Sequence, residues 1–332
     1  SGYSNWNPIG NLNNKFTGSL DGKNYSIQNL TLNNPTANAQ GLFAYFAPAT
    51  AKDSIKNLAL QNVQVHAYDS IGSLAGKVIN GTLYNCSVEG SIQGNQRLGG
   101  LAGFISSSIV TQCNGDVTMT GNGRIGGLIG YLTSSTIKQS YCLGSITTDA
   151  TEIGGIASFA TNASCSITEC FTDMTLTANN SIGGIIYGSN YGSITNNYSL
   201  SDIYSYGQAG GILSYGYNCN IQHNYSTGAI YGHQSGGIGS NNWGTSQTFK
   251  NCLAINAEIK STSETEYIGR IWGGPTTSLQ SNFAWDSIYV SDSIITNASQ
   301  NNQNGENVSY AQVTDSAFYK NAGIWDTPWD FT

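Results

Sequence analysis

Acidic side chains at a regular spacing are the first residues in this sequence that could carry out chemistry. Glu89 and Asp116 are 27 residues apart, and Asp173 lies two further intervals along, with Leu143 between them. If these positions stack, neighbouring carboxylates could act as a general acid and base or bind calcium. Solvated turn carboxylates give the same pattern, and the basic residues that a polysaccharide-cleaving site needs are sparse. We therefore interpret these carboxylates as surface groups and predict no catalytic residue.

The histidines and cysteines form no motif for metal binding. His66, His223 and His233 are scattered, and neither H-E-x-x-H nor C-x-x-C occurs, so we expect no metal and no cofactor. Seven cysteines leave at least one thiol unpaired within the chain. A disulfide between Cys86 and Cys113 is possible by distance, but structural free thiols are the preferred interpretation. One repeat position, interpreted as an inward column, holds Cys86, Cys113, Cys170 and Cys252, with Asn197 and Asn224 in other coils.

Aromatic side chains also recur in register. One set contains Tyr141, Phe171, Tyr198 and Tyr225, and a second contains Phe104, Tyr131, Phe159 and Tyr215. Stacked rings can be structural packing, or they can form a platform for the apolar faces of sugar rings. Because tyrosines crowd the later repeats, we predict a tyrosine-rich recognition face there. The predicted ligand-binding residues are Tyr198, Tyr204, Tyr206, Tyr217, Tyr225 and Tyr231.

A column of charged residues precedes a recurring glycine pair. Arg97, Arg124 and Glu152 occupy this position in consecutive repeats, so Arg124 could bridge to Glu152 along the stack. Surface ion pairs contribute only about 0–1 kcal/mol. A structural or solubility role is therefore favoured over a ligand clamp.

The element that must position all of these side chains is a repeat. Short words centred on glycine, which is paired in all but the first and last copies, begin at Ile71, Leu98, Ile125, Ile153, Ile182, Ala209, Ser235 and Ile268. Successive starts differ by 27, 27, 28, 29, 27, 26 and 33 residues, which chance does not produce. The last copy, Ile268-Gly269-Arg270, has lost its second glycine, so we expect the coil near residue 270 to be distorted. The polar segment Ser299 to Ser309 also breaks the period and predicts a loop on one face.

Each repeat alternates apolar and polar residues with a period of two, which predicts short strands, and lacks helical stripes. Such a unit cannot bury its apolar face alone, so coils stack and share one core. The fold class is therefore all-β: a single-domain parallel β-helix, or solenoid, of about 9–10 coils of roughly 27 residues, with a right-handed coil favoured. We expect an N-terminal capping coil at 1–40, repeat coils at 41–290 and a C-terminal capping segment at 291–332.

Composition excludes several classes of protein. Only 9% of residues are charged and 41 are glycine, which argues against a disordered polyelectrolyte and against a helical protein. The net charge of −7 disfavours nucleic-acid partners. No apolar run approaches the roughly 18 residues of a membrane helix. The first residues have no apolar signal-peptide core, and we expect the chain to be part of a larger surface-anchored or secreted protein.

The repeat resembles the GLUG motif. The matching words are Gly100-Leu101-Ala102-Gly103, Gly127-Leu128-Ile129-Gly130 and the variant Ser73-Leu74-Ala75-Gly76. Asn224-Tyr225-Ser226-Thr227-Gly228 matches the segment that follows the motif. The opening segment from Trp6 and the closing segment, Trp325-Asp326 and Trp329-Asp330-Phe331, resemble the first and last parts of such domains.

This resemblance implies a repeat domain of bacterial surface or secreted proteins, including adhesins and the non-catalytic region of immunoglobulin A1-specific metallopeptidases. We predict an extracellular or cell-surface location and a non-catalytic adhesin that recognises glycans or host glycoproteins along the coil surface. One alternative is a carbohydrate-active enzyme, a polysaccharide lyase or glycoside hydrolase on a β-helix. A second is a structural stalk that only spaces another domain.

Overall fold

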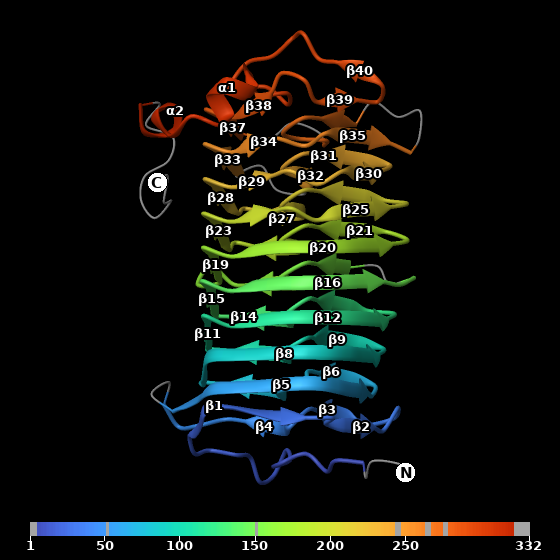
Figure 1. Cartoon of the computed structure of the whole chain (residues 1–332), viewed down its shortest axis with the longest axis vertical. Coiled ribbons are helices and arrows are strands. Elements are labelled where there is room, and N and C mark those ends of the chain that lie inside the picture. The colour runs from blue at the N-terminus through green and yellow to red at the C-terminus, as the bar shows by residue number, and fades with distance from the viewer. Residues whose placement is uncertain are drawn as a thin grey trace.

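The computed structural model describes residues 5–50, 53–149, 152–242, 247–262, 267–274 and 278–321. It is an all-β parallel solenoid of about nine turns spaced about 27 residues apart, with about 59% strand and 3% helix. The coils stack along one axis from the N-terminal to the C-terminal end (Figure 1). The expected fold class is confirmed.

Three sheets run along the rod, and each coil contributes to all of them in turn. We call them sheets A, B and C. In the described residues, sheet A has eight strands: β4 (Phe43–Phe46), β7 (Ala75–Ile79), β10 (Ala102–Ser106), β14 (Ile129–Thr133), β18 (Ala157–Thr161), β22 (Ile186–Asn190), β27 (Leu213–Tyr217) and β32 (Gly239–Asn242). Sheet C has nine: β3 (Asn38–Gln40), β6 (Asp69–Ile71), β9 (Gln96–Gly99), β13 (Arg124–Gly126), β17 (Glu152–Gly154), β21 (Ser181–Gly183), β26 (Gln208–Gly210), β31 (Gln234–Gly236) and β36 (Ile268–Gly269).

Sheet B is the long, curved outer wall and takes two or three strands from most coils. Its described strands are β1 (Leu20–Gln28), β2 (Thr31–Asn33), β5 (Ser54–His66), β8 (Thr82–Gly94), β11 (Ile109–Thr111), β12 (Asn114–Gly121), β15 (Thr136–Lys138), β16 (Tyr141–Thr147), β19 (Ser166–Thr168), β20 (Phe171–Ala178), β23 (Ser193–Thr195), β24 (Tyr198–Ser199), β25 (Asp202–Ser205), β28 (Asn220–Gln222), β29 (Tyr225–Ser226), β30 (Ile230–Gly232), β33 (Thr248–Lys250), β34 (Leu253–Ala254), β35 (Glu258–Ser261), β37 (Ser278–Gln280), β38 (Phe283–Trp285), β39 (Tyr289–Val290), β40 (Ser293–Ile294) and β41 (Glu306–Val308).

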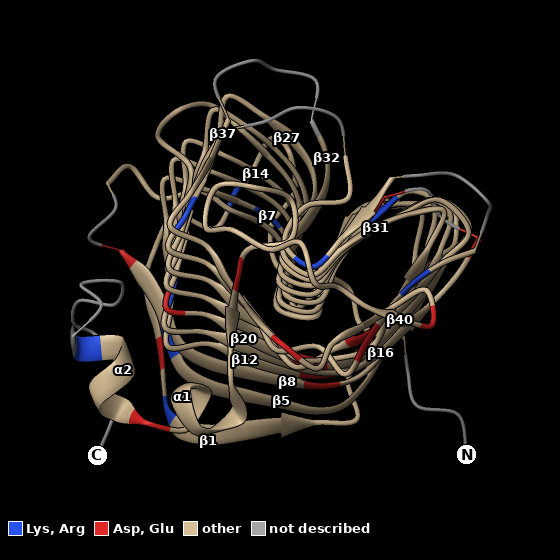
Figure 2. Ribbon diagram, turned by 90° about the horizontal axis from the view of Figure 1, so that it is seen from above, with Lys and Arg blue, Asp and Glu red and all other residues tan. Residues whose placement is uncertain are grey.

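The cross-section is not a closed ring of three flat walls. Seen from the C-terminal end, the chain passes anticlockwise from sheet C to sheet A and on through sheet B, so the rising coil is right-handed (Figure 2). Sheets A and C meet at a corner that points inward, and the outline is therefore notched on this side. The notch runs along the rod because every coil repeats the same corner.

The glycine pairs build this inward corner. The pair in β13 and the turn after it is Gly126-Gly127, and a Cβ atom on Gly127 would lie 2.1 Å from the carbonyl oxygen of Gly155 in the next coil. A Cβ atom on Gly126 would lie 2.0 Å from the carbonyl oxygen of Ile129. Neither glycine has a positive φ, so close approach of backbones, and not left-handed geometry, requires glycine here.

The column of cysteines and asparagines points inward, as predicted. The backbone N–H of Cys86 donates to Sγ of Cys113 at 3.4 Å, and that of Cys170 donates to Oδ1 of Asn197 at 2.9 Å. The N–H of Asn197 in turn donates to Oδ1 of Asn224 at 2.9 Å. Each side chain thus satisfies a buried N–H of the coil before it, which explains why small polar groups recur there.

All seven cysteines are buried free thiols, and no disulfide joins Cys86 to Cys113. Burial raises the pKa of Cys170 and of Cys252 to about 12. The contact with Cys113 instead lowers the pKa of Cys86, but that thiol is as buried as the others. Because a reagent must reach the thiolate, we expect no cysteine to react rapidly with Ellman's reagent at pH 8 in the native protein. All seven should react after unfolding in guanidinium chloride. Fast labelling of one or more native thiols would contradict this packing.

The first coil is covered by the segment that precedes it. Ile9 and Phe16 form parallel bridges with Phe43 and Phe46 of β4, and the indole Nε1 of Trp6 donates to the carbonyl oxygen of Leu42 at 3.2 Å. These contacts shield the lower end of the core.

The last coil differs from the expected distortion near residue 270 and from the expected loop at Ser299 to Ser309. Ile268 and Gly269 still pair with Ser235 and Gly236, so the register persists where we expected distortion. Arg270 takes the place of the second glycine, and its side chain is fully buried. The segment Ser299 to Ser309 lies across the end of the coil and not to one side, because the N–H groups of Ile271 and Trp272 both donate to the carbonyl oxygen of Gln303.

Two short helices, α1 (Tyr310–Val313) and α2 (Ser316–Asn321), complete this end of the described chain. Phe318 and Tyr319 pack with Phe283, Val308 and the ring of Tyr225 on sheet B. The expected closing segment at Trp325-Asp326 and Trp329-Asp330-Phe331 lies outside the described residues.

Candidate functional site

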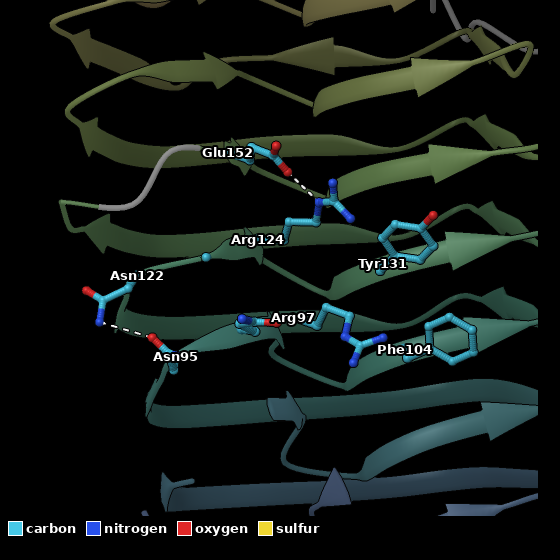
Figure 3. A pocket seen from close by; sticks show the side chains of 9 residues that line it. Asn95, Arg97, Phe104, Asn122, Arg124, Tyr131 and Glu152 are labelled. Carbon is cyan, nitrogen blue, oxygen red and sulfur yellow. Dashed lines mark hydrogen bonds and ion pairs between the residues drawn. The ribbon is translucent and has the colours of Figure 1, made fainter. Parts of the chain in front are cut away.

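A groove of about 710 Å³ lies along the inward corner between sheets A and C. Three consecutive coils form it, and we call it the arginine groove. Its lining is Asn95, Gln96, Arg97, Phe104, Asn122, Gly123, Arg124, Tyr131 and Glu152. Figure 3 shows Arg97 and Arg124 on one wall and Phe104 and Tyr131 on the other. The corner thus brings together two columns that the sequence separates by seven residues.

Each arginine of the groove is held by a carboxylate in a neighbouring coil. Nε of Arg97 donates to Oδ1 of Asp69 at 2.8 Å, and a second nitrogen of the same guanidinium contacts Oδ2. This hydrogen bonding raises the pKa of Arg97. Nε of Arg124 donates to the Glu152 carboxylate, which confirms the predicted bridge. Both arginine side chains stay about one-third exposed, at 32% and 38%, so they remain open to a ligand.

The aromatic wall supports the same guanidinium groups. The ring centroids of Phe104 and Tyr131 are 5.8 Å apart, and those of Tyr131 and Phe159 are 6.0 Å apart, in the predicted register. The guanidinium carbon of Arg124 lies 5.2 Å from the Tyr131 centroid and 4.9 Å from that of Phe159. That of Arg97 lies 6.0 Å from the Phe104 centroid. Cation–π contacts and ion pairs therefore fix both arginines before any ligand binds.

The wall shifts by one residue in the coil after Phe159. Gly188 occupies the register between Phe159 and Tyr215, and Tyr187 supplies the ring instead. The Tyr187 centroid is 5.9 Å from Phe159 and 6.1 Å from Tyr215. Burial and the nearby Glu152 carboxylate raise the pKa of Tyr187, so its phenol stays protonated and able to donate a hydrogen bond.

Amide side chains form the outer rim. Nδ2 of Asn122 donates to Oδ1 of Asn95 at 3.2 Å across adjacent coils (Figure 3). Together with the arginines they offer several donors and acceptors over a short distance, and this set suits a ligand with many hydroxyl or acidic groups.

The six predicted tyrosines do not form one face. Tyr198 and Tyr225 lie in sheet B, Tyr204 and Tyr231 lie further along the same sheet, and Tyr217 lies in sheet A. The Tyr198 and Tyr225 rings stack at 5.0 Å and 3°, and the Tyr204 and Tyr231 rings at 5.1 Å and 6°.

Stacking at this distance covers the ring face that each tyrosine of a pair turns toward the other. Tyr217 meets Tyr191 edge to face at 5.2 Å. Tyr206 alone among the six is largely exposed, at 76%. A ligand-binding role for these residues stays a prediction.

The predicted acidic register is present but lies away from the groove. Asp116 pairs with Glu89 on one side and Leu143 on the other, and Leu143 pairs with Asp173. All three carboxylates are exposed and lie in strands of sheet B. Among the described residues, no three His, Cys, Asp or Glu side chains are grouped to hold a metal ion.

The sequence predicts the charged column of Arg97, Arg124 and Glu152 and the second aromatic set, but it does not predict that the two lie next to each other. It missed Asp69, Asn95, Asn122 and Tyr187. A usable signal was the position of each column relative to the glycine pair: the arginines come two residues before it and the rings five residues after its first glycine. An inward corner at the pair places those two columns on facing walls.

Comparisons with known proteins agree with the fold. No protein-family model matches the chain, so the GLUG assignment stays a prediction. A solved structure titled as that of a "putative immunoglobulin A1 protease" from Bacteroides ovatus superposes with a TM-score of 0.50 and 17% identity, over 72% of this chain and 81% of that one. At this identity the likeness shows a shared β-solenoid and nothing of activity.

One curated protein matches in sequence over a short stretch. Halomucin from Haloquadratum walsbyi (strain DSM 16790 / HBSQ001) is 36% identical over 104 residues, which is 29% of this chain and 1% of halomucin. The chain therefore spans a very small part of that relative.

In the described residues, no helix has the length and hydropathy to cross a membrane.

Proposed function

We propose that this chain is a non-catalytic binding domain of a larger secreted or surface-anchored bacterial protein, and that it recognises glycans or the glycans of host proteins. The observation that carries the proposal is the arginine groove. It is open, it runs along the rod, and its polar groups are fixed in advance by ion pairs and aromatic rings.

The chemistry of the groove suits sugars better than other ligands. A glycan is elongated and carries many hydroxyl groups, so it needs donors and acceptors distributed along a channel, with apolar edges beside them. Arg97, Arg124, Asn95 and Asn122 supply the polar groups, and the rings of Phe104 and Tyr131 supply the apolar edge. Pre-organised side chains lower the entropy that binding must overcome.

The described residues favour binding over bond cleavage. Arg124 neutralises Glu152, and Arg97 neutralises Asp69, so neither carboxylate of the groove is placed as a free acid or base. Glu89 and Asp116 lie outside the groove on sheet B. The titles of the two similar proteins, a mucin-like name and an immunoglobulin A1 protease, support an extracellular location for this chain as well.

The test is a glycan-array screen followed by affinity measurement on the best ligand. Replacing both Phe104 and Tyr131 by Ala removes the apolar edge of the groove and one aromatic contact of each arginine, and we expect at least a tenfold loss of affinity. Tyr141→Ala is the matched control, because it removes a half-buried stacked ring on sheet B. We expect the control to bind like wild type.

Two outcomes would contradict parts of this proposal. Loss of binding only in the triple variant Tyr204→Ala, Tyr206→Ala and Tyr217→Ala would move the site from the groove to the tyrosines. An absence of any glycan ligand for the wild-type protein would overturn glycan recognition and support the stalk alternative.

A further inference from the structure

We infer that the arginine groove selects acidic glycans, chains whose sugars carry carboxylate or sulfate groups, and that Lys77 and Arg97 form the anion subsite. This inference rests on the proposed function and names its ligand class. Lys77 lies in β7, in register with Phe104, one coil before the groove residues.

The local charge of the groove, counted with Lys77 and Asp69 beside it, is opposite to that of the chain. Lys77, Arg97 and Arg124 contribute three positive charges, and Asp69 and Glu152 contribute two negative ones, which leaves +1. The whole chain carries −7. The sequence contains three arginines, and two of them line this groove. On an acidic surface, such an island focuses an approaching anion.

Of the three cations in and beside the groove, Lys77 forms no ion pair with a described carboxylate, although the nearby Asp69 charge acts to raise its pKa. Its ammonium nitrogen lies 5.6 Å from the ring centroid of Tyr45 and 5.8 Å from that of Phe104. Within the described residues no Asp or Glu lies within ion-pair distance of it. Burial and the like charge of Arg97 lower the pKa of Lys77. An anion bound between Lys77 and Arg97 would offset both effects.

The guanidinium groups are positioned to share such an anion. Asp69 holds Nε and one terminal nitrogen of Arg97, and the ring of Phe104 lies beside the same group. Figure 3 shows the Arg97 and Arg124 guanidinium groups reaching toward Phe104 and Tyr131, on successive coils. Charge-assisted hydrogen bonds to a carboxylate or sulfate are about twice as strong as neutral ones.

The charge is confined to one part of the groove. The register of Arg124 and Glu152 continues as Ser181, Gln208 and Gln234. The later coils therefore present neutral groups at the same position. This change predicts one anionic contact region near Lys77 and Arg97, flanked by a neutral stretch.

The experiment uses calorimetry to compare two pairs of probes, each matched except for one kind of acidic group. Oligogalacturonate is measured against its neutral, carboxyl-reduced form, which tests carboxylate recognition. Chondroitin sulfate oligosaccharide is measured against unsulfated chondroitin, which keeps its carboxylates, so this pair tests sulfate recognition. We expect at least a tenfold preference for one acidic probe over its partner, and weaker binding as NaCl rises from 50 to 200 mM.

Lys77→Gln should remove most of this preference and flatten the salt dependence. Lys138→Gln is the matched control, because it deletes an exposed lysine on sheet B, and it should keep the preference. Thermal unfolding of both variants checks that they fold. Equal affinity for the two members of both probe pairs, or an unchanged preference in Lys77→Gln, overturns this inference and leaves glycan binding standing. No binding of any glycan overturns the proposed function itself.

Discussion

Replacing Gly127 by Ala is expected to destabilise the protein by about 4 kcal/mol or more, which is exceptional for the addition of one methyl group. The new Cβ would lie 2.1 Å from the carbonyl oxygen of Gly155 and 2.6 Å from Sγ of Cys142. The oxygen belongs to backbone of the next coil, so it cannot move without distorting the parallel ladder. Urea unfolding followed by circular dichroism measures the loss.

Gly18→Ala is the control for this change. A Cβ at Gly18 would meet only the Phe16 ring at 3.6 Å, which is ordinary contact, and the residue is exposed. We expect its free energy of unfolding to stay within about 0.5 kcal/mol of wild type. Similar small effects in both variants would show that the corner is not tightly packed.

The stacking of successive coils explains how much of the fold can be predicted from the sequence. A parallel solenoid has a simple rule: residues one period apart are neighbours in a ladder. The aromatic set of Phe104, Tyr131 and Phe159 and the acidic pair of Glu89 and Asp116 therefore lie in the predicted registers. Periodicity reports stacking directly, and stacking is most of this fold.

The repeat period does not predict the shape of the coil in cross-section. Periodicity does not say whether a glycine corner points outward or inward, and only the inward corner places Arg97 beside Phe104. The partner of Arg97 was also hidden, because Asp69 is in register with Gln96 and reaches Arg97 diagonally. The predicted tyrosines lie in more than one sheet for a related reason: a count of residues per coil does not say which sheet carries each residue.

Arg270 is the buried group whose removal should have the second large effect. Nε, Nη1 and Nη2 of its guanidinium donate to the carbonyl oxygens of Asn304, Trp285 and Gly305, at 2.9, 3.1 and 3.2 Å. Burial lowers its pKa to about 10, so it remains charged at neutral pH. The side chain thus fixes the segment that covers the end of the core.

Arg270→Met keeps the apolar stem but leaves three carbonyl oxygens without their donors. A buried acceptor that loses its partner costs about 1–3 kcal/mol, so we expect a loss of about 3 kcal/mol or more. Because coils couple mainly to their neighbours, the change should first open the C-terminal end. Hydrogen exchange should therefore accelerate at the N–H groups of Ile271 and Trp272, which donate to Gln303, before it changes in the first coils.

Arg124→Met is the control for this variant, because it removes a partly exposed guanidinium whose ion pair contributes at most about 1 kcal/mol. If the two variants unfold at the same urea concentration, Arg270 does not hold the cap. If Arg270→Met instead accelerates exchange equally along the whole rod, the solenoid unfolds as one unit. In that case Arg270, which stands where earlier repeats have their second glycine, would stabilise every coil and not the terminal coil alone.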